Sequence, residues 1–419
     1  MKRWTVLLSV PLVFAGAQDV QALSFGSFDP RAMAMGGAGV AAGTSANASF
    51  YNPALLAAAR SSEDFSLEFP VVGARVADPD QLINSLDDYQ NANYPDAFSA
   101  AINQWNAASS QAELVAARDA VVASGQNLVS GLSSLSNKDL QTQLNAGMVV
   151  GIPSKHWGTA FYVNARADGG ALVDITQSDL DSINSVIDTV QKLDLTGLSN
   201  SSTVQLPDPT TSLTSAVEAR GAVISEVGVS LAREFAVAGN TVALGITPKY
   251  MKITTFDYRE HVDTADVTLD QGKKSYNDFN IDVGLAHDYG TNWKTGLVVK
   301  NIISKDYTTA LGNSIQLDPQ ARWGIAYSGQ MATVALDVDL LKNKATGLDP
   351  ASQYVALGAE FNVLDFLQLR AGYRYNISDS DTSSAAVGLG LSPFGVHMDL
   401  AVEGSDREVG VGFQLGFRF

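Results

Sequence analysis

The last eleven residues alternate strictly between apolar side chains and small or polar ones, and this rhythm constrains the fold more than any other feature of the chain. The apolar positions are Val409, Val411, Phe413, Leu415, Phe417 and Phe419. The positions between them are Gly410, Gly412, Gln414, Gly416 and Arg418. Because successive side chains of a β-strand point to opposite faces, the pattern predicts a strand with one continuously apolar face.

The same period of two recurs upstream, and nearly every charged residue there lies on the polar parity. The segments are 223–231, 242–250, 279–285, 322–328, 333–340, 355–361 and 367–375. A charge facing lipid at the membrane midplane costs about 2–4 kcal/mol, whereas a charge facing a barrel lumen costs little. The residues that this parity assigns to a lumen are Arg322, Asp337, Asp339, Glu360, Arg370, Arg374, Asp399 and Arg418.

A water-soluble β-sandwich also alternates, but its outer face is usually rich in Lys and Glu. Here the polar parity is rich in Gly, Ala, Ser and Asn, and only 17% of the chain is charged. We therefore predict an all-β membrane protein, a closed antiparallel transmembrane barrel of about 12–14 strands. The final strand resembles that of bacterial outer-membrane barrels, whose terminal aromatic is read by the barrel-assembly machinery. Phe413, Phe417 and Phe419 are the candidate assembly signal.

The N-terminus reads as a cleaved export signal, residues 1–22. Lys2 and Arg3 precede an apolar stretch over residues 6–15, which is too short to span a bilayer. Cleavage after Ala22 is favoured and cleavage after Ala17 is the alternative. Together with the barrel pattern, this signal predicts a protein of the Gram-negative cell outer membrane.

A helical period interrupts the alternation at about residues 77–140 and 174–215. Phe98, Ile102 and Trp105 are spaced for one helix face, and Ser110 to Glu113 forms a capping box. Residues 144–152 and 157–163 alternate between these two stretches and predict a strand pair. The helices are either extramembrane elements of the barrel or a surface on which a partner docks.

Several functional classes are disfavoured by composition and motifs. The net charge of −17, without a basic cluster, argues against nucleic acid as a partner. The chain has no Cys, and its four histidines, His156, His261, His287 and His397, are isolated in sequence. No Gly-x-Ser-x-Gly or HExxH motif occurs. We expect no enzymatic activity, no cofactor and no metal site.

Residues 25–40 (FGSFDPRAMAMGGAGV) and 50–56 (FYNPALL) resemble the opening of the FadL-type outer-membrane transport superfamily, and most closely its conjugal transfer TraF-like branch. The runs 317–327, 356–361 and 369–374 resemble that branch as well. The resemblance implies that residues 23–62 fold into the lumen as a hatch, with the barrel over 63–419. It further implies close backbone packing at Gly36, Gly37 and Gly39, and a turn at Asn52, Pro53 and Ala54.

Two functions follow from this resemblance. One is passive passage of small hydrophobic solutes, or another role related to conjugal transfer. The alternative is a non-transporting structural or assembly component of a conjugation or secretion apparatus. The implied partners are outer-membrane lipid and lipopolysaccharide, the barrel-assembly machinery, a small hydrophobic ligand, and proteins of the conjugation apparatus.

Overall fold

The computed structural model describes residues 29–58, 64–196, 198, 204–237, 240–262, 272–343, 351–364 and 366–419. The predicted signal peptide, residues 1–22, lies outside the described residues. The same holds for both ends of the predicted hatch, 23–28 and 59–62.

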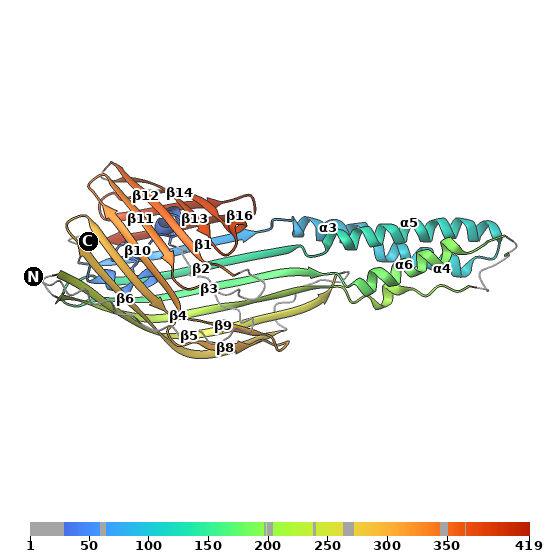
Figure 1. Ribbon diagram of the computed structural model, residues 1–419, viewed down its shortest axis with the longest axis horizontal. Helices are drawn as coiled ribbons and strands as arrows, with labels where there is room; N and C mark the ends of the chain where they lie inside the picture. The colour runs from blue at the N-terminus through green and yellow to red at the C-terminus, as the bar shows by residue number, and fades with distance from the viewer. Residues whose placement is uncertain are drawn as a thin grey trace, which may run out of the picture.

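Fourteen strands of the described chain close into one antiparallel barrel, which confirms the predicted fold class (Figure 1). In chain order they are β1 (Ser66–Ala77), β2 (Asp139–Ile152), β3 (Gly158–Asp174), β4 (Ala216–Val237), β5 (Asn240–His261), β6 (Lys273–Tyr289), β7 (Trp293–Lys300), β10 (Gln320–Ser328), β11 (Ala332–Asp339), β12 (Tyr354–Leu364), β13 (Leu367–Asn376), β14 (Ser384–Leu391), β15 (Val396–Gly404) and β16 (Glu408–Arg418). Each strand pairs with its neighbour in this order, and β16 pairs with β1 to close the sheet.

The outer face of the barrel is apolar and the inner face is polar. Val387 and Val411 are more than half exposed, whereas Arg322 and Asp337 on the other parity are almost fully buried. Closure leaves no unpaired sheet edge, as a bilayer demands of a spanning sheet. None of the helices in the described part of the chain combines the length and the apolarity that a membrane-spanning helix needs.

The barrel has two unequal walls. We call β2–β6, with 14 to 22 residues each, the long wall. We call β7 and β10–β16, with 8 to 11 residues each, the short wall. The C-terminus and the short turns lie at one end, and the long connections lie at the other (Figure 1).

A helical arm extends from the long-connection end of the long wall (Figure 1). It contains α3 (Leu82–Ala92), α4 (Tyr94–Ala107), α5 (Gln111–Leu135) and α6 (Gln177–Lys192), followed by the short helix η3 (Pro209–Ser212). At the start of α5, the Ser110 hydroxyl accepts a hydrogen bond from the Glu113 amide at 3.3 Å, as the capping box predicts. The side chains of Phe98, Trp105 and Leu128 lie in the apolar core of the arm, which reaches the ends of the long wall at Val173 of β3 and Val217 of β4.

Two short strands, β8 (Lys305–Thr308) and β9 (Ser314–Leu317), pair outside the barrel sheet. Tyr307 and Leu317 pack against Ile224, Met251 and Ile253 of the long wall. This hairpin therefore covers the inner face of the long wall where it rises above the short wall.

The alternation of Leu67, Phe69 and Val71 predicts a strand, which β1 confirms, but the single face that their shared parity predicts is wrong. In the structure Phe69 is 58% exposed, but Val71 is 1% exposed and faces inward. The register shifts between Glu68 and Val71 at a bulge that contains Pro70, and a bulge inserts one residue and reverses the parity beyond it.

Candidate functional site

Residues 29–58 fill the barrel interior as a hatch. They form α1 (Pro30–Ala34), α2 (Ala48–Tyr51) and the short helix η1 (Pro53–Leu56), and nearly all of them are buried. Asp29 caps α1 by accepting a hydrogen bond from the Ala32 amide at 2.9 Å, and Pro30 occupies the first turn, where it needs no partner for its nitrogen.

Arg31 clamps α1 to the short wall. Its Nε lies 2.8 Å from Oε2 of Glu360, and its Nη2 donates to Oε1 at 2.9 Å. Its remaining nitrogen donates to the Ala42 carbonyl at 2.7 Å, which ties the two ends of the loop after α1 together. Glu360 also receives Arg370 at 2.6 Å, and Arg370 reaches Asp399 at 2.6 Å. A bidentate guanidinium–carboxylate pair fixes orientation as well as distance.

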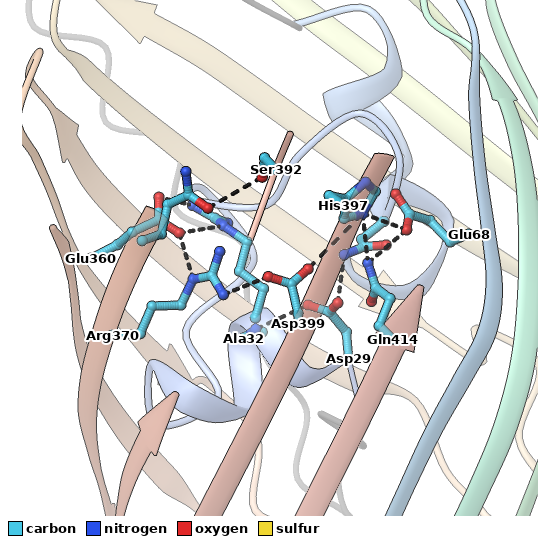
Figure 2. Close-up of polar contacts among 12 residues, drawn as sticks. Asp29, Ala32, Glu68, Glu360, Arg370, Ser392, His397, Asp399 and Gln414 are labelled. Atoms are coloured by element: carbon cyan, nitrogen blue, oxygen red, sulfur yellow. Dashed lines mark hydrogen bonds and ion pairs between the residues drawn. The ribbon is translucent and has the colours of Figure 1, made fainter. Parts of the chain in front are cut away.

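The charged row continues from Asp399 toward β1 (Figure 2). His397 Nε2 lies 3.9 Å from Asp399 and 2.6 Å from Glu68. Gln414 donates to Glu68 at 2.7 Å, and Arg418 approaches the same carboxylate at 3.1 Å. One connected row of charges thus runs from β1 across β15 and β13 to β12 and ends on the hatch.

Asp337 and Arg322 hold the loop after α1. The Asp337 carboxylate accepts hydrogen bonds from the Gly39 and Val40 amides at 2.8 and 2.9 Å. Arg322 pairs with Asp339 at 2.6 Å and donates to the Gly37 carbonyl at 3.3 Å.

Gly36 and Gly37 have φ angles of +68° and +93°, in the left-handed region that other residues adopt at a cost. These contacts and angles account physically for the Gly-Gly-Ala-Gly run.

Glycines on the inner face of the strands make room for the hatch. A Cβ at Gly372 would overlap the backbone of Met35 and Gly36, and one at Gly284 would overlap the Asn52 side chain. Gly358 and Gly388 face Met35 and Ala34 in the same way. An arginine at inward Gly372 is tolerated only where no hatch packs against it. The structure places the hatch there, so the small residues of the polar parity serve contact rather than an empty lumen.

Asn52, Pro53 and Ala54 lie deep in the lumen. The Asn52 side chain accepts from the Ala54 amide at 3.1 Å and donates to the Val40 and Leu285 carbonyls, both at 3.0 Å. Pro53 begins η1. This element turns the chain and also joins the two parts of the hatch to β6.

The other predicted residues lie elsewhere on the barrel. Arg374 lies at the long-connection end and pairs with Glu408 at 2.8 Å, near Arg75 and Glu403, which also pair with each other. Phe413 and Phe417 point outward from β16, and Phe419 is 68% exposed at the end of the chain. The role of these three aromatics in assembly remains a prediction.

A second buried cluster joins the hatch to the long wall. Lys249 lies 3.1 Å from Glu226 and 3.0 Å from Asp282, and the Lys300 ammonium donates to the Phe50 carbonyl at 3.0 Å. A cavity of about 70 Å³ adjoins this cluster. It is lined by apolar and aromatic side chains, among them Phe50, Tyr162, Ile224 and Leu317, and by charged ones, among them Lys249 and Lys300.

A larger cavity of about 190 Å³ lies at the short-turn end, between Arg31 and Thr44 of the hatch and Arg370, His397 and Arg418 of the short wall. Among the described residues, no three His, Asp or Glu side chains are placed to hold a metal ion.

The sequence pattern does not predict several members of these clusters. His397 is isolated in sequence, but in the structure Glu68, Asp399 and Arg418 surround it. A signal existed: His397 shares the inward parity of Asp399, and Glu68 opposes Leu67 and Phe69. Arg31 carried no such signal, since the hatch has no strand period.

The comparisons with known proteins give one family and a group of barrels. A family model described as "F plasmid transfer operon, TraF, protein" matches residues 49–339. Among curated proteins, no match was found.

The solved structures that match include the crystal structure of the P. putida toluene transporter TodX, which is 10% identical, with a TM-score of 0.48, over 94% of this chain and 99% of that chain. A TodX monoaromatic hydrocarbon channel deltaS2 mutant is 11% identical, with a TM-score of 0.48, over 94% and 98%. A triple mutant of Rh. blastica porin is 11% identical, with a TM-score of 0.28, over 67% and 91%. Similarity at this level does not identify a solute.

Proposed function

We propose that this chain, which belongs to the TraF protein family of the F plasmid transfer operon, is an outer-membrane barrel that passes small hydrophobic solutes when its hatch moves. The apolar outer face and the closed sheet support a membrane location. Outer-membrane barrels have short periplasmic turns and longer outer loops, so we place the arm on the cell exterior. No catalytic activity forms part of the proposal.

The observation that carries the proposal is a hatch held by polar contacts with a cavity on either side. The contacts of Arg31, Asp337 and Lys300 are ion pairs and hydrogen bonds, each of which can break and re-form without unfolding the barrel. The cavities of about 70 and 190 Å³ both touch hatch residues, so a displacement of the hatch would change the size of both.

The solute class follows from the resemblance and agrees with part of the lining. Phe50, Ile224 and Leu317 offer apolar contact beside the charged groups in the smaller cavity. A solute with a small apolar body fits such a surface better than a large polar one.

A disulfide lock tests whether movement of the hatch matters. The hydroxyls of Ser49 on the hatch and Ser230 on β4 lie 2.9 Å apart, and the chain has no cysteine of its own. The double variant Ser49→Cys, Ser230→Cys therefore places two thiols in reach of each other with little change in volume. The probe is N-phenyl-1-naphthylamine, which lipopolysaccharide excludes from intact cells.

We expect the oxidised double variant to lose most protein-dependent uptake of the probe and to regain it on reduction. The single variant Ser49→Cys is the matched control and should respond to neither treatment. Undiminished uptake by the fully oxidised double variant would show that the hatch need not move.

The second candidate function is a component of an apparatus, and the arm favours it. The arm packs around an apolar core that continues from the ends of β3 and β4, and transport does not require such an extension. Replacing residues 79–137 and 176–214 with short turns should leave uptake of the probe intact and abolish association with apparatus proteins. If uptake falls while association persists, the arm belongs to transport instead.

A further inference from the structure

The turns of the short wall carry exposed apolar side chains at their tips. Met331, in the turn between β10 and β11, is 75% exposed, and Phe394, between β14 and β15, is fully exposed. Phe366, which follows β12, is about half exposed. Exposed apolar residues at the tips of three successive hairpins of one rim indicate a surface that contacts an apolar partner.

Two turns at the same end differ. Lys155 and His156 are exposed between β2 and β3 of the long wall, and Gly290 and Thr291 are exposed between β6 and β7, where the two walls meet. Exposed aromatic residues flank these polar residues, namely Trp157, Tyr289 and Trp293. This order, an aromatic girdle and then polar turns, is typical of a wall that passes through the membrane interface into water.

Strand length accounts for the contrast. β11 and β14 have 8 residues each, whereas β4 and β5 have 22. At about 3.3 Å per residue and a tilt near 40°, eight residues rise about 20 Å, while the apolar band of such barrels is about 25 Å tall. The same arithmetic gives about 55 Å for 22 residues. The short strands cannot cross the apolar band unaided, whereas the long ones exceed it.

We infer that the turns of the short wall lie within the lipid of the periplasmic leaflet and complete the apolar band there. The partner is phospholipid, because the strands that lead to these turns carry exposed apolar residues on their outer face, such as Val334 of β11 and Val387 of β14. The other end of the short wall is extended in the same way, since Leu340 after β11 and Ile377 after β13 are both about half exposed. The barrel is therefore seated unevenly, with the short-wall part of the periplasmic rim in lipid and the β2–β3 and β6–β7 turns of the same rim in water.

This inference is independent of solute passage. The test uses the full-length chain in phosphatidylcholine vesicles, with a fluorophore attached to a single cysteine at Met331→Cys or Phe394→Cys. Thr291→Cys in the turn between β6 and β7 is the matched control. Brominated acyl chains quench a fluorophore in lipid, and iodide quenches one in water.

We expect bromolipid to quench the labels at 331 and 394 several-fold more strongly than the label at 291, and iodide to show the reverse order. Equal access of iodide to all three labels would place the short-wall turns in water, free to meet a protein instead, and would overturn the inference.

Charge substitution gives a second readout. Met331→Asp and Phe394→Asp should lower the folded fraction more in thick bilayers than in thin ones, because mismatch grows with bilayer thickness. Thr291→Asp should show no dependence on thickness. A loss that is the same in every bilayer would contradict the seating in lipid.

Discussion

The arm and the barrel bury opposite kinds of residue. In the arm, Phe98 and Trp105 are fully buried, and charged side chains such as Asp188 face solvent. In the barrel, Arg322 and Asp399 are buried, and Val387 and Val411 form the outer face. Water around the arm drives apolar groups inward, whereas lipid around the barrel accepts them and leaves the interior to polar groups. The pattern of buried and exposed residues is thus reversed between the part of the chain in water and the part in lipid.

The two interiors also differ in how they hold together. Non-directional apolar contacts bind the helices of the arm, so the arm should melt as a unit. The hatch is bound by apolar clusters, such as Met35 and Ala38 against Ala335, and in addition by directed ion pairs and hydrogen bonds, each of which depends on its own partner. Among its described residues, the arm core has no such set of directed charged contacts, so single polar substitutions should loosen the hatch more selectively than they loosen the arm.

The largest expected effect is in the arm. Trp105→Ala removes a fully buried ring and its hydrogen bond to the Val204 carbonyl at 2.9 Å, and should lower the free energy of unfolding of the arm by about 3–5 kcal/mol. The helical circular dichroism signal should melt at a lower temperature. The barrel should keep its heat-modifiable mobility on gels. Val115→Ala, at a half-exposed position, is the control; a barrel that unfolds together with the arm would refute their separate interiors.

The next effect compares the two faces of the barrel. Val411→Arg puts a charge toward lipid and should destabilise insertion by about 2–4 kcal/mol. Gly372→Arg should be equally harmful for another reason, since the side chain would overlap the hatch backbone. Deleting residues 29–58 should rescue Gly372→Arg and not Val411→Arg, as measured by the folded fraction in vesicles. Rescue of both variants, or of neither, would undo the assignment of faces.

A smaller effect is expected at the clamp. Arg31→Met removes charged hydrogen bonds to Glu360, which keeps Arg370, so the loss should be about 1.5–3 kcal/mol. The hatch should become more accessible to protease while the strands stay protected. In a double-mutant cycle with Glu360→Gln, the loss of stability in the double variant should be smaller than the sum of the losses in the two single variants. Strict additivity would mean that the pair is not coupled.

The smallest effect concerns the base of the arm, where Asp179 accepts hydrogen bonds from the Ser215 and Thr214 amides at 2.7 and 2.8 Å. Burial raises the pKa of Asp179, but the hydrogen bonds from Ser215 and Thr214 outweigh burial and hold that pKa below its usual range. A lowered folded pKa contributes stability above the unfolded value of about 3.9, and this stability is lost as the pH falls through the folded value.

Asp179→Asn should therefore cost about 1–2 kcal/mol at neutral pH and should flatten the acid dependence of arm melting below pH about 4. Melting temperatures of both proteins across acidic pH provide the measurement. An unchanged acid dependence would show that Asp179 does not contribute to the pH dependence of arm stability.

Sequence periodicity was sufficient for the barrel and insufficient for its contents. Alternation between residues such as Val411 and Gly412 predicts a strand face without further knowledge, because the period is local. The prediction of faces fails at the bulge that contains Pro70, because one inserted residue reverses the parity of Val71. The helical stripe of Phe98, Ile102 and Trp105 succeeds for the same local reason.

The clusters in the lumen depend on contacts between distant residues. Arg31 meets Glu360 across 329 positions of the chain, and Glu68 meets Gln414 across 346. Nothing local marks Arg31 as a partner of Glu360, and the inward glycines predict a crowded or plugged lumen without indicating which hatch residues contact them. Inward parity marks candidates such as His397, but only the closed fold says which of them meet.

The most direct test of a plugged, polar lumen is the reactivity of a thiol at Ala335→Cys. Ala335 faces inward, is fully buried, and lies in a cluster with Met35 and Ala38 of the hatch. In vesicles, the intact chain should resist a charged, water-soluble thiol reagent, and a chain lacking residues 29–58 should react rapidly. Equal and rapid reaction in both proteins would mean that the lumen is open with the hatch in place, contrary to this account.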